Sequence, residues 1–424
     1  MTPRKRRLLL EMRYPSWEVL TLSGVLDRAT AQYPDRPYVI TDERTWSYAD
    51  MQIWSRRIAS GLIAQGLKIG EHVALVMANY PEFVAVKFAI SRVGCVCVPV
   101  NFLLRGQELA YVLDQSDSAM LIMMDVFRGQ NYVAELGRIS GDVPKLRRTF
   151  IHPTEEGSAS SLSTLDMLVE SATHESDAEL VRREAAADGA SLSDILYTSG
   201  TTGRSKGVML THDMVLRAAF SSVIAGAFED GRRMQFAMPM YHVFGYTECM
   251  VAVLFVGGAI VPHLLFDPVA LLDAAERHRT TELVGVPMMT HKLIDAARVR
   301  GFDSTHLKVM FNSGGANVPT VWGDIRSALG VDEVRMGYGM TETSASATSS
   351  RPEDDDTNLI TTHGCFKPAN VAGDPAIGGR VAIYKAIDPE TLCDLPDGDE
   401  GELVVRGPIV TRGYYKKPDR KSVV

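Results

Sequence analysis

Residues 197–212, YTSGTTGRSKGVMLTH, combine small hydroxylated residues and glycines with two cations, Arg204 and Lys206. Backbone N–H groups and hydroxyls in such a loop can converge on one anion, and a lysine adds a mobile positive charge. The segment lies between two apolar runs, where a flexible Ser/Gly linker, the alternative, rarely occurs. It is not a Walker A loop, because Ser205 stands five residues after Gly200 and no Lys-Ser or Lys-Thr pair follows. The segment therefore predicts a phosphate-binding loop.

Three further segments have residue types suited to ligand chemistry. RMGYGMTETSA, residues 335–345, places an aromatic ring, which suits a purine, near a carboxylate, which suits a hard cation carrying triphosphate; alone it also fits a helix-capping turn. FNSGGANVP, residues 311–319, allows close backbone approach at its glycines, although alone it is only a strand-to-turn signal. MPMYHVFGYT, residues 238–247, sets a histidine among aromatic residues, and alone that histidine also fits a core position.

Together, and in their order along the chain, these segments resemble the adenylate-forming (AMP-binding) superfamily, which includes acyl- and aryl-CoA synthetases, luciferases and the adenylation domains of peptide synthetases. The resemblance runs from about residue 20 to 419. It includes GELVVRGPIVTRGYYKKPD, residues 401–419, which is similar to the stretch leading toward the family's ribose-binding aspartate. One departure is Ser205, which stands where the family usually has proline. The resemblance implies the N-terminal large domain of an acyl- or aryl-CoA synthetase.

The resemblance implies a site for ATP and Mg²⁺. Tyr338 would stack on adenine, and Thr341 would touch the α-phosphate. Glu342 and Thr198 would bind Mg²⁺, and the loop with Lys206 would hold the leaving pyrophosphate. The expected nucleotide-binding residues are Thr198, Ser199, Gly200, Thr201, Thr202, Gly203, Lys206, Gly314, Gly315, Ala316, Gly337, Tyr338, Gly339, Met340 and Thr341.

The resemblance also implies a pocket for a carboxylic acid. His242 would border the carboxylate and later the thiol-transfer path, so the expected catalytic residues are His242, Lys206 and Thr341. Peptide-synthetase domains usually carry an aspartate near this position, but no acidic residue lies between Phe236 and Thr247. An α-amino acid is disfavoured, because its buried ammonium would be unpaired. The expected pocket is apolar and aromatic and fits a fatty or an aromatic acid alike. Its residues are Tyr241, His242, Phe244, Tyr246, Val286, Gly314, Gly315, Met340 and Ala345.

Short apolar runs alternate with helical patterns along most of the chain, as at 72–79, 95–101 and 119–124. Such alternation predicts βαβ units, a parallel sheet and an α/β fold. With 424 residues the chain is too long for one core. We expect a first α/β subdomain at 15–185, a second at 186–372 carrying the phosphate loop and adenine motif, and a β-rich subdomain at 373–424.

Local signals add four expectations. The basic start, residues 1–15, is expected to be a frayed terminus, and the polar stretch 153–191 a surface connection. RPEDDDT, residues 351–357, is expected to be a solvated loop. Thr211 is a candidate N-cap for the helix that follows it.

Composition limits the partners. A formal net charge of −8, from 44 basic and 52 acidic residues, argues against nucleic-acid binding, which leaves a basic footprint. No apolar run approaches the ~20 residues of a membrane span, although the basic start allows a weak association with a membrane surface. The five cysteines have no zinc or CxxC spacing. They predict buried reduced thiols and a cytoplasmic location.

The implied chemistry is attack of a carboxylate on the α-phosphate of ATP, giving acyl-AMP, followed by transfer of the acyl group to CoA. Both steps depend on positioning and charge stabilisation. In the family, a ribose-binding aspartate, a hinge and a lid domain of ~100 residues with a further lysine follow, whereas this sequence ends RKSVV. We therefore expect nucleotide binding with slow or no turnover. The alternative is a non-catalytic protein that binds nucleotide or acyl-adenylate. Oligomeric state and the length of the acid cannot be predicted from the sequence.

Overall fold

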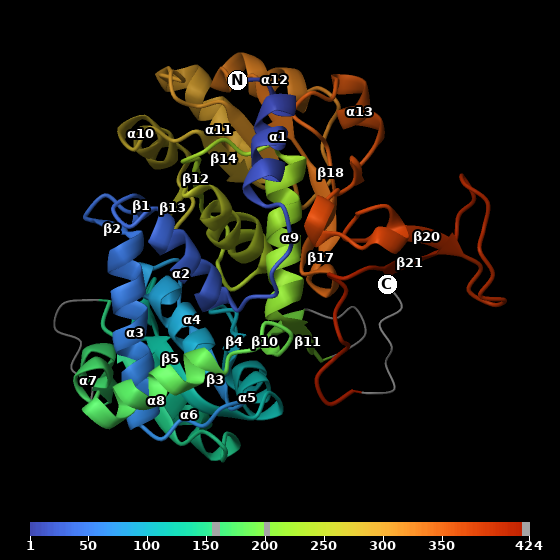
Figure 1. Cartoon of the computed structure of the whole chain (residues 1–424). Coiled ribbons are helices and arrows are strands. Elements are labelled where there is room, and N and C mark those ends of the chain that lie inside the picture. The colour runs from blue at the N-terminus through green and yellow to red at the C-terminus, as the bar shows by residue number, and fades with distance from the viewer. Residues whose placement is uncertain (155–161, 199–203, 418–424) are drawn as a thin grey trace.

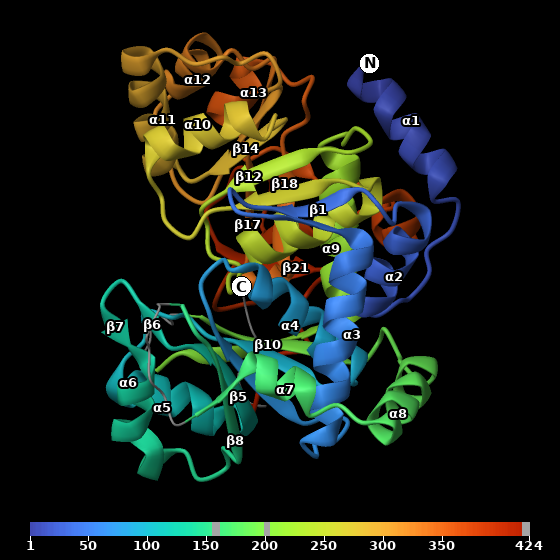
Figure 2. The ribbon, with the colours of Figure 1, turned by 90° about the vertical axis from the view of Figure 1, so that its left-hand side faces the viewer.

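Two seven-stranded sheets, one in each half of the molecule, form the framework of the structure (Figures 1 and 2). The computed structural model describes residues 1–154, 162–198 and 204–417. In Figure 2 one half lies above the other, and helices cover the sheets. A smaller antiparallel part completes the molecule. This arrangement confirms the predicted α/β fold class.

The first sheet has the strand order β11-β10-β4-β3-β5-β8-β9. Every residue of β3, β4 and β5 is buried, because helices cover both faces of these central strands and leave no polar face. The sheet is parallel except at its edge, where β10 and β11 form an antiparallel hairpin. The bounds are β3 His72–Val76, β4 Val96–Pro99, β5 Ser118–Met124, β8 Arg148–His152, β9 Ser163–Thr164, β10 Leu192–Thr198 and β11 Lys206–Thr211.

The second sheet has the order β16-β15-β14-β12-β13-β1-β2 and is parallel except for its edge pair β1–β2. Its strands are β1 Pro37–Ile40, β2 Thr45–Ser47, β12 Arg233–Phe236, β13 Ala259–Pro262, β14 Glu282–Gly285, β15 Val309–Asn312 and β16 Glu333–Arg335.

The two sheets exchange segments along the sequence. Strands β1 and β2 belong to the second sheet, although they precede every strand of the first. The hairpin β10–β11 belongs to the first sheet, although it follows residue 185. Sheet membership thus crosses the expected boundary at 185, and the division into 15–185, 186–372 and 373–424 stays an interpretation of the sequence.

Helices surround the sheets, and several of their ends carry the signals that the sequence shows. Thr211 caps α9, since its hydroxyl accepts a hydrogen bond from the Met214 N–H at 3.2 Å. Gly226 follows the last turn of this helix. The helix bounds are α1 Pro3–Arg13, α2 Leu22–Gln32, α3 Tyr48–Ala64, α4 Pro81–Arg92, α5 Gly106–Gln115, α6 Tyr132–Ile139, α7 Leu165–Glu170, α8 His174–Ala185, α9 His212–Ala225, α10 Pro268–Arg277, α11 Pro287–Arg300, α12 Val321–Leu329 and α13 Asp356–Thr361.

Short strands and tight helical turns complete the chain. β17, β18 and β19 form an antiparallel sheet beside α9, and the hairpin β20–β21 projects from the body at the right of Figure 1. The strands are β6 Val126–Phe127, β7 Gln130–Asn131, β17 Gly337–Met340, β18 Ala345–Ser349, β19 Cys365–Phe366, β20 Ile383–Ile387 and β21 Glu402–Arg406. The 3₁₀ and π turns are η1 Ser140–Asp142, η2 Phe244–Val251, η3 Ala252–Val256, η4 Thr341–Thr343, η5 Asn370–Ala372 and η6 Pro375–Ile377.

The expectation of a frayed N-terminus is wrong. Residues 3–13 form α1, whose Arg6 donates to the Ala227 carbonyl at 2.6 Å and pairs with Glu333 at 2.5 Å. Arg7 also pairs with Glu353. These contacts with distant parts of the chain hold the helix against the second half of the molecule.

Two other local expectations also need correction. The polar stretch expected as a surface connection includes α7 and α8 in its described part, and α8 packs on α3. The acidic stretch 351–357 is only partly a loop, because Asp355 caps α13. Cys95, Cys97 and Cys249 are buried as predicted, whereas Cys365 and Cys393 are exposed.

Within the described segments, no helix combines the length and the apolar character that crossing a membrane requires. The cytoplasmic location stays a prediction.

Candidate active site

The hairpin β10–β11 presents the two ends of the expected phosphate loop. Thr198 and Lys206 are cross-strand partners at the open end of the hairpin, and both are half-buried. Tyr111 donates its hydroxyl to the Ser205 carbonyl at 3.2 Å, and the Arg204 guanidinium lies 5.2 Å from the Tyr111 ring centre. Contacts from α5 therefore hold the segment in which serine replaces the family's proline. The expected loop residues Ser199, Gly200, Thr201, Thr202 and Gly203 lie outside the described residues.

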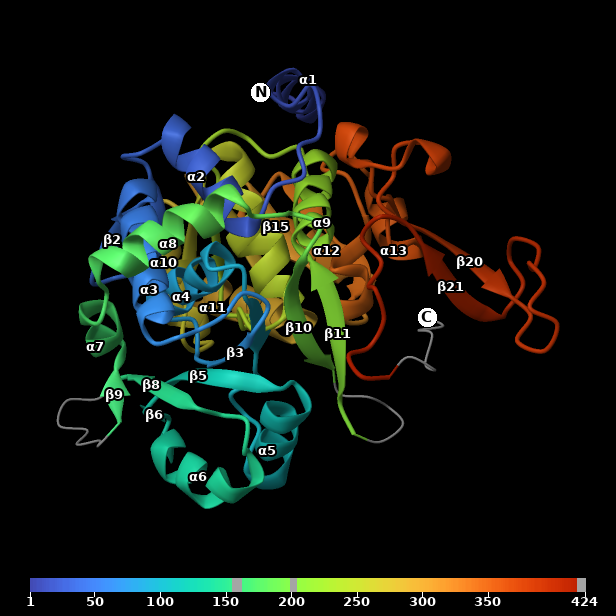
Figure 3. The same ribbon diagram turned by 60° about the horizontal axis from the view of Figure 1, so that its bottom comes forward.

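Residues 407–417, here named the edge segment, run along β11 (Figure 3). Backbone bonds join Met209 N to Gly413 O at 3.1 Å, and Tyr415 N to Gly207 O at 2.8 Å. A Cβ on Gly207 would lie 2.6 Å from the Ile195 side chain, so glycine is required there. The edge segment thus extends the first sheet beside Lys206.

The adenine motif lies on β17 and η4. A Cβ on Gly339 would lie 2.1 Å from the Ala345 carbonyl, and one on Gly337 would lie 2.8 Å from the Thr348 carbonyl. These two glycines therefore let β17 approach β18 closely. The half-buried Tyr338 ring contacts His363 and Tyr384, with ring centres 5.7 and 5.8 Å apart.

The edge segment joins the adenine motif to the phosphate hairpin. The Thr411 N–H donates to the Glu342 carbonyl at 2.7 Å, and the Tyr414 hydroxyl donates to Glu342 Oε1 at 2.8 Å. The Lys206 ammonium lies 4.6 Å from the centre of the same tyrosine ring. The structure thus brings Lys206 and Glu342 to one place, next to the buried Thr341.

The residues at this place fit a magnesium ion that arrives with a triphosphate. Glu342 is half-buried, and Tyr414 contacts its Oε1, so Oε2 can face a metal. The hydroxyl of Thr198 is a second oxygen donor on the adjacent hairpin. Across the described ranges, His, Cys, Asp and Glu nowhere gather in groups of three or more that could hold a metal. One carboxylate with few protein ligands suits Mg²⁺, which takes further ligands from phosphates and water.

The expected acid pocket is partly assembled. Phe244 lies edge-on to Phe311 at 5.4 Å, and a Cβ on Gly314 would lie 3.2 Å from Val286 and 3.8 Å from Phe244. Gly314 has a φ of +89° and so belongs to the conformations that favour glycine. Gly315 and Ala316 are exposed next to it. Ser313 donates its hydroxyl to the Gly337 carbonyl, which places this wall beside the adenine motif.

Tyr241 and His242 lie at the turn after β12. Tyr241 packs edge-on against Phe102 of the first half, with ring centres 5.3 Å apart. Nδ1 of His242 accepts a hydrogen bond from the Phe244 N–H at 3.2 Å. The protein atoms around the ring lower the pKa of His242, although the side chain keeps access to solvent.

Two residues expected in the pocket lie in the core. Tyr246 is 0% exposed, and its hydroxyl donates to Asp194 Oδ2 at 3.0 Å. The Lys87 ammonium pairs with Asp194 and lies 4.5 Å from the Tyr246 ring centre. Ala345 is 3% exposed at the start of β18. Met340, by contrast, is half-buried and directly precedes Thr341.

Sequence reasoning did not single out two residues that shape this region. Asn79 donates to the Met238 carbonyl at 2.9 Å and accepts from the Met240 N–H at 2.8 Å, which fixes the turn leading to His242. Its signal was its place just after β3, where ligand sites form at the carboxyl ends of parallel strands. Tyr414 lies within the 401–419 segment that resembles the family, but the spacing of residues does not connect it with Glu342.

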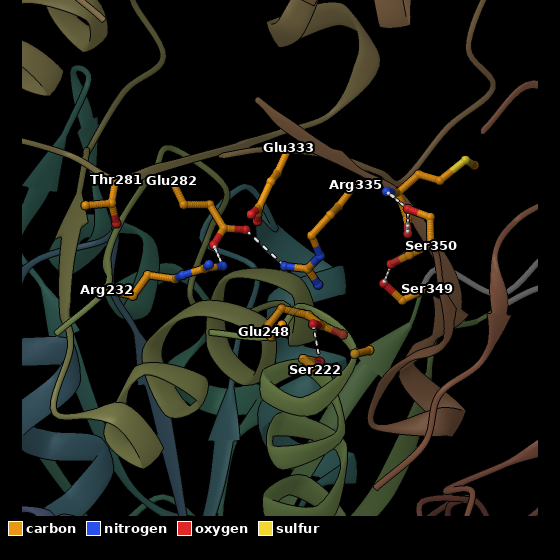
Figure 4. A network of polar contacts seen from close by, with 12 residues as sticks. Ser222, Arg232, Glu248, Thr281, Glu282, Glu333, Arg335, Ser349 and Ser350 are labelled. Carbon is orange, nitrogen blue, oxygen red and sulfur yellow. Dashed lines mark hydrogen bonds and ion pairs between the residues drawn. The ribbon is translucent and has the colours of Figure 1, made fainter. Parts of the chain in front are cut away.

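A buried ion network lies at the start of the adenine motif and includes Arg335 (Figure 4). Arg232 and Arg335 reach the Glu282 carboxylate from two sides, at 2.6 and 3.2 Å. Arg335 ends β16 and is the first residue of the 335–345 segment, whose strand β17 begins at Gly337. Lys367 and Ser222 contact Glu248 nearby. The network fixes the strand that leads into the motif.

Cavities elsewhere do not coincide with this place. One, of about 280 Å³, lies between α1 and α2 and is lined by Arg13, Tyr14 and Arg28 among others. Another, of about 470 Å³, lies beside Asp117, Lys145 and Tyr415. The candidate site is therefore defined by its converging side chains.

The sequence pattern of the AMP-binding enzyme family matches residues 26–415. The chain belongs to the AMP-binding enzyme family. A propanoyl:CoA ligase of Mycobacterium tuberculosis, whose propanoyl group carries a methyl-dioxo-octahydroindenyl ring system, is 32% identical over 398 residues. The match covers 94% of this chain and 72% of that protein. Within the AMP-binding family the chain is thus a member of the acyl-CoA ligase branch, whose reaction joins an acid to a thiol using ATP and CoA.

Solved structures show the same AMP-binding enzyme fold. The long-chain-fatty-acid-CoA ligase FadD1 from Archaeoglobus fulgidus has a TM-score of 0.81 at 21% identity, covering 96% of this chain and 78% of that one. The N-terminal domain of FACL13 from Mycobacterium tuberculosis has a TM-score of 0.75 at 20% identity, covering 94% and 92%. The chain therefore corresponds mainly to the N-terminal domain of these AMP-binding enzymes.

Proposed function

We propose that this protein activates a carboxylic acid with an uncharged side chain. A carboxylate oxygen forms a bond to the α-phosphorus of ATP, the bond from that phosphorus to pyrophosphate breaks, and acyl-AMP results. The sulfur of CoA then bonds to the acyl carbon, AMP leaves, and the thiol proton passes to solvent. The observation that carries the proposal is the meeting of Lys206 and Glu342 at one tyrosine between the phosphate hairpin and the adenine motif.

The phosphate end of the reaction is assigned to charged and hydroxylated groups. Lys206, with the loop before it, holds the departing pyrophosphate and offsets its negative charge. Thr341 contacts the α-phosphate. Glu342 and Thr198 would hold Mg²⁺, which neutralises part of the triphosphate charge when bound. Ser199 to Gly203 keep their predicted role in binding the phosphates.

The adenine is assigned to the space beside β17. Tyr338 offers a half-buried aromatic face, Gly339 directly after it is exposed, and Gly315 is exposed as well. A base stacked on an aromatic ring suits such a surface. Gly314, Ala316, Gly337 and Met340 complete the proposed wall.

His242 is assigned to the acid as a hydrogen-bond donor. Its lowered pKa keeps the imidazole neutral at pH 7. Because Nδ1 accepts from the Phe244 N–H, the proton of the neutral ring lies on Nε2. His242 can therefore donate from Nε2 to a substrate carboxylate oxygen and, during thiol transfer, to the developing oxyanion.

The surroundings favour an acid without a cationic group. Glu248, the acidic residue that follows this turn, is 2% exposed and paired with Lys367 at 3.3 Å. It has no carboxylate oxygen to spare for a substrate ammonium. Tyr241, Phe244 and Val286 supply apolar surface that suits aliphatic or aromatic rings.

The test is formation of acyl-AMP, measured by mass spectrometry with ATP, Mg²⁺ and a panel of fatty, aromatic and alicyclic acids. Lys206→Ala should lower adenylate formation by on the order of 100-fold. Lys385→Ala is the matched control, because Lys385 lies on the projecting hairpin and pairs with Asp394. ATP binding without adenylate from any acid would contradict the proposed activity of this chain; it would agree with the expected lack of turnover and with the alternative of a nucleotide-binding protein. Equal loss in both lysine variants would remove the assigned role of Lys206.

A further inference from the structure

Tyr414 contacts both charged groups of the proposed site. Its hydroxyl donates to Glu342 Oε1 at 2.8 Å, and its ring centre lies 4.6 Å from the Lys206 ammonium. The side chain is only 6% exposed. One neutral residue therefore stands against a carboxylate on one side and an ammonium on the other.

The backbone fixes Tyr414 independently of its side chain. Tyr414 and Val208 form a β-bridge, and the Tyr415 N–H donates to the Gly207 carbonyl at 2.8 Å. Three residues earlier, the Thr411 N–H donates to the Glu342 carbonyl at 2.7 Å. The edge segment therefore keeps position 414 beside both charged residues whatever side chain it carries.

The alternative to this arrangement is a direct ion pair. An ammonium and a carboxylate brought to one half-buried place attract each other, the more strongly as water is excluded. A pair of that kind would satisfy both charges before any ligand arrives. Among the residues that the structure describes, Lys206 and Glu342 form no ion pair with each other, and Tyr414 contacts both.

We infer that Tyr414 is a positioning residue that keeps Lys206 and Glu342 apart and leaves each charge available to the nucleotide. Its ring holds the ammonium by a cation–π contact, from which the lysine can turn to phosphate oxygens. Its hydroxyl fixes one carboxylate oxygen and so aims the other at a metal. This inference rests on the proposed function. It assigns two roles to one side chain: the ring positions Lys206, and the hydroxyl positions Glu342.

Three variants separate the two parts of Tyr414. Tyr414→Phe removes the hydroxyl and keeps the ring, and Tyr414→Leu removes both. Tyr415→Phe is the matched control, because it removes a neighbouring hydroxyl that donates to Asp117 at 2.7 Å, away from the site. ATP affinity is measured by calorimetry with Mg²⁺ and with a chelator.

Tyr414→Phe should bind ATP as the parent does in the presence of the chelator. The increase in ATP affinity that Mg²⁺ gives should be about three- to tenfold smaller in this variant than in the parent. Tyr414→Leu should change both affinities, and Tyr415→Phe should match the parent within about twofold. Thermal melts check that all three variants fold. Equal effects of Tyr414→Phe with and without Mg²⁺, or an effect of Tyr415→Phe as large, would overturn the inference.

A second readout does not need nucleotide. The rate at which an amine reagent labels Lys206, followed by mass spectrometry of the peptide, reports how the ammonium is held. Tyr414→Leu should change that rate at least threefold, while Tyr414→Phe and Tyr415→Phe should not. If the parent chain binds no ATP, the proposed function fails. The labelling experiment still tests the contact between Tyr414 and Lys206: an unchanged labelling rate in Tyr414→Leu would show that the tyrosine ring does not hold the ammonium.

Discussion

Charges are handled differently in the buried ion network and in the candidate site. In the network, Arg232, Glu282 and Arg335 are at most 1% exposed, and the two cations share one carboxylate. In the candidate site, Lys206 and Glu342 are half-buried and both contact a neutral tyrosine. The charges of the network are paired within the fold, whereas those of the candidate site stay available to a ligand. Substitutions should therefore affect stability in the network and ligand binding in the candidate site.

The largest effect is expected at Glu282, which pairs with both arginines of the buried ion network. Glu282→Gln leaves two buried guanidinium groups without their shared carboxylate. Breaking a buried ion pair from one side costs about 3–5 kcal/mol, so the free energy of unfolding in urea should fall by that amount. Glu402→Gln, on the exposed start of β21, is the control and should change it little. A loss below about 1 kcal/mol at Glu282 would refute the structural role of the network.

A slightly smaller effect is expected at Gly226. A Cβ at this position would lie 2.5 Å from the Arg335 guanidinium, whose place is fixed by Glu282. Overpacking of this kind costs typically about 1–3 kcal/mol, and Gly226→Ala should fall at the upper end in chemical denaturation. Gly323→Ala in α12 has open space around its new methyl group and should stabilise the protein by about 0.5–1 kcal/mol. Equal effects of the two alanines would show that Arg335 can move aside.

Acid should destabilise the protein through a buried neutral histidine. Burial lowers the pKa of His212 to about 4, and Nδ1 of its ring accepts from the Leu22 N–H at 3.3 Å. Below the ordinary pKa near 6.5 the His212 imidazole is protonated in the unfolded chain but stays neutral in the folded chain. Stability should therefore fall as the pH drops from about 6.5 to 4, by about 2 kcal/mol at pH 5 from this group.

Urea unfolding at pH 7 and pH 5 checks this expectation. His212→Asn keeps a hydrogen-bond acceptor near Nδ1 but cannot take up the proton. The asparagine variant should therefore lose about 2 kcal/mol less than the parent between the two pH values. The same pH dependence in parent and variant would contradict the assignment.

The smallest effect on stability is expected at Lys206. Lys206→Ala removes a half-buried ammonium that contacts a ring and pairs with no carboxylate in the described part of the chain. We expect a change within about 0.5 kcal/mol in the free energy of unfolding, together with the large loss of adenylate formation stated above. A destabilisation as large as that of Glu282→Gln would show that Lys206 stabilises the fold as the buried ion network does, and would contradict the difference between the two regions.

Much of the fold could be predicted because its signals are local. The strands at His72–Val76, Val96–Pro99 and Ser118–Met124 are short apolar runs bounded by turn residues, and Thr211 is a cap of a preferred type. The order of α helices and β strands then limits the architecture to an α/β fold.

The rest depended on contacts between distant residues. The N-terminal helix is held because Arg6 reaches Glu333, 327 positions away. Tyr414 belongs to the candidate site because it donates a hydrogen bond to Glu342, 72 positions earlier. Tyr246 lies in the core, where it donates a hydrogen bond to Asp194. A sequence pattern states which side chains are suited to a ligand, but burial and partners decide which of them remain available.

Because the two sheets contain strands from distant parts of the sequence, some strands are synthesised on the ribosome long before their partners. Val39 of β1 pairs with Ile260 of β13, so β1 leaves the exit tunnel some 220 residues before its neighbour. At about 5–20 residues per second the delay is on the order of 10–40 s. Throughout that interval β1 can pair with β2 along one edge, but the edge that later pairs with β13 has no partner. Chaperones that shield nascent chains should therefore influence the yield of this protein more than its final stability suggests.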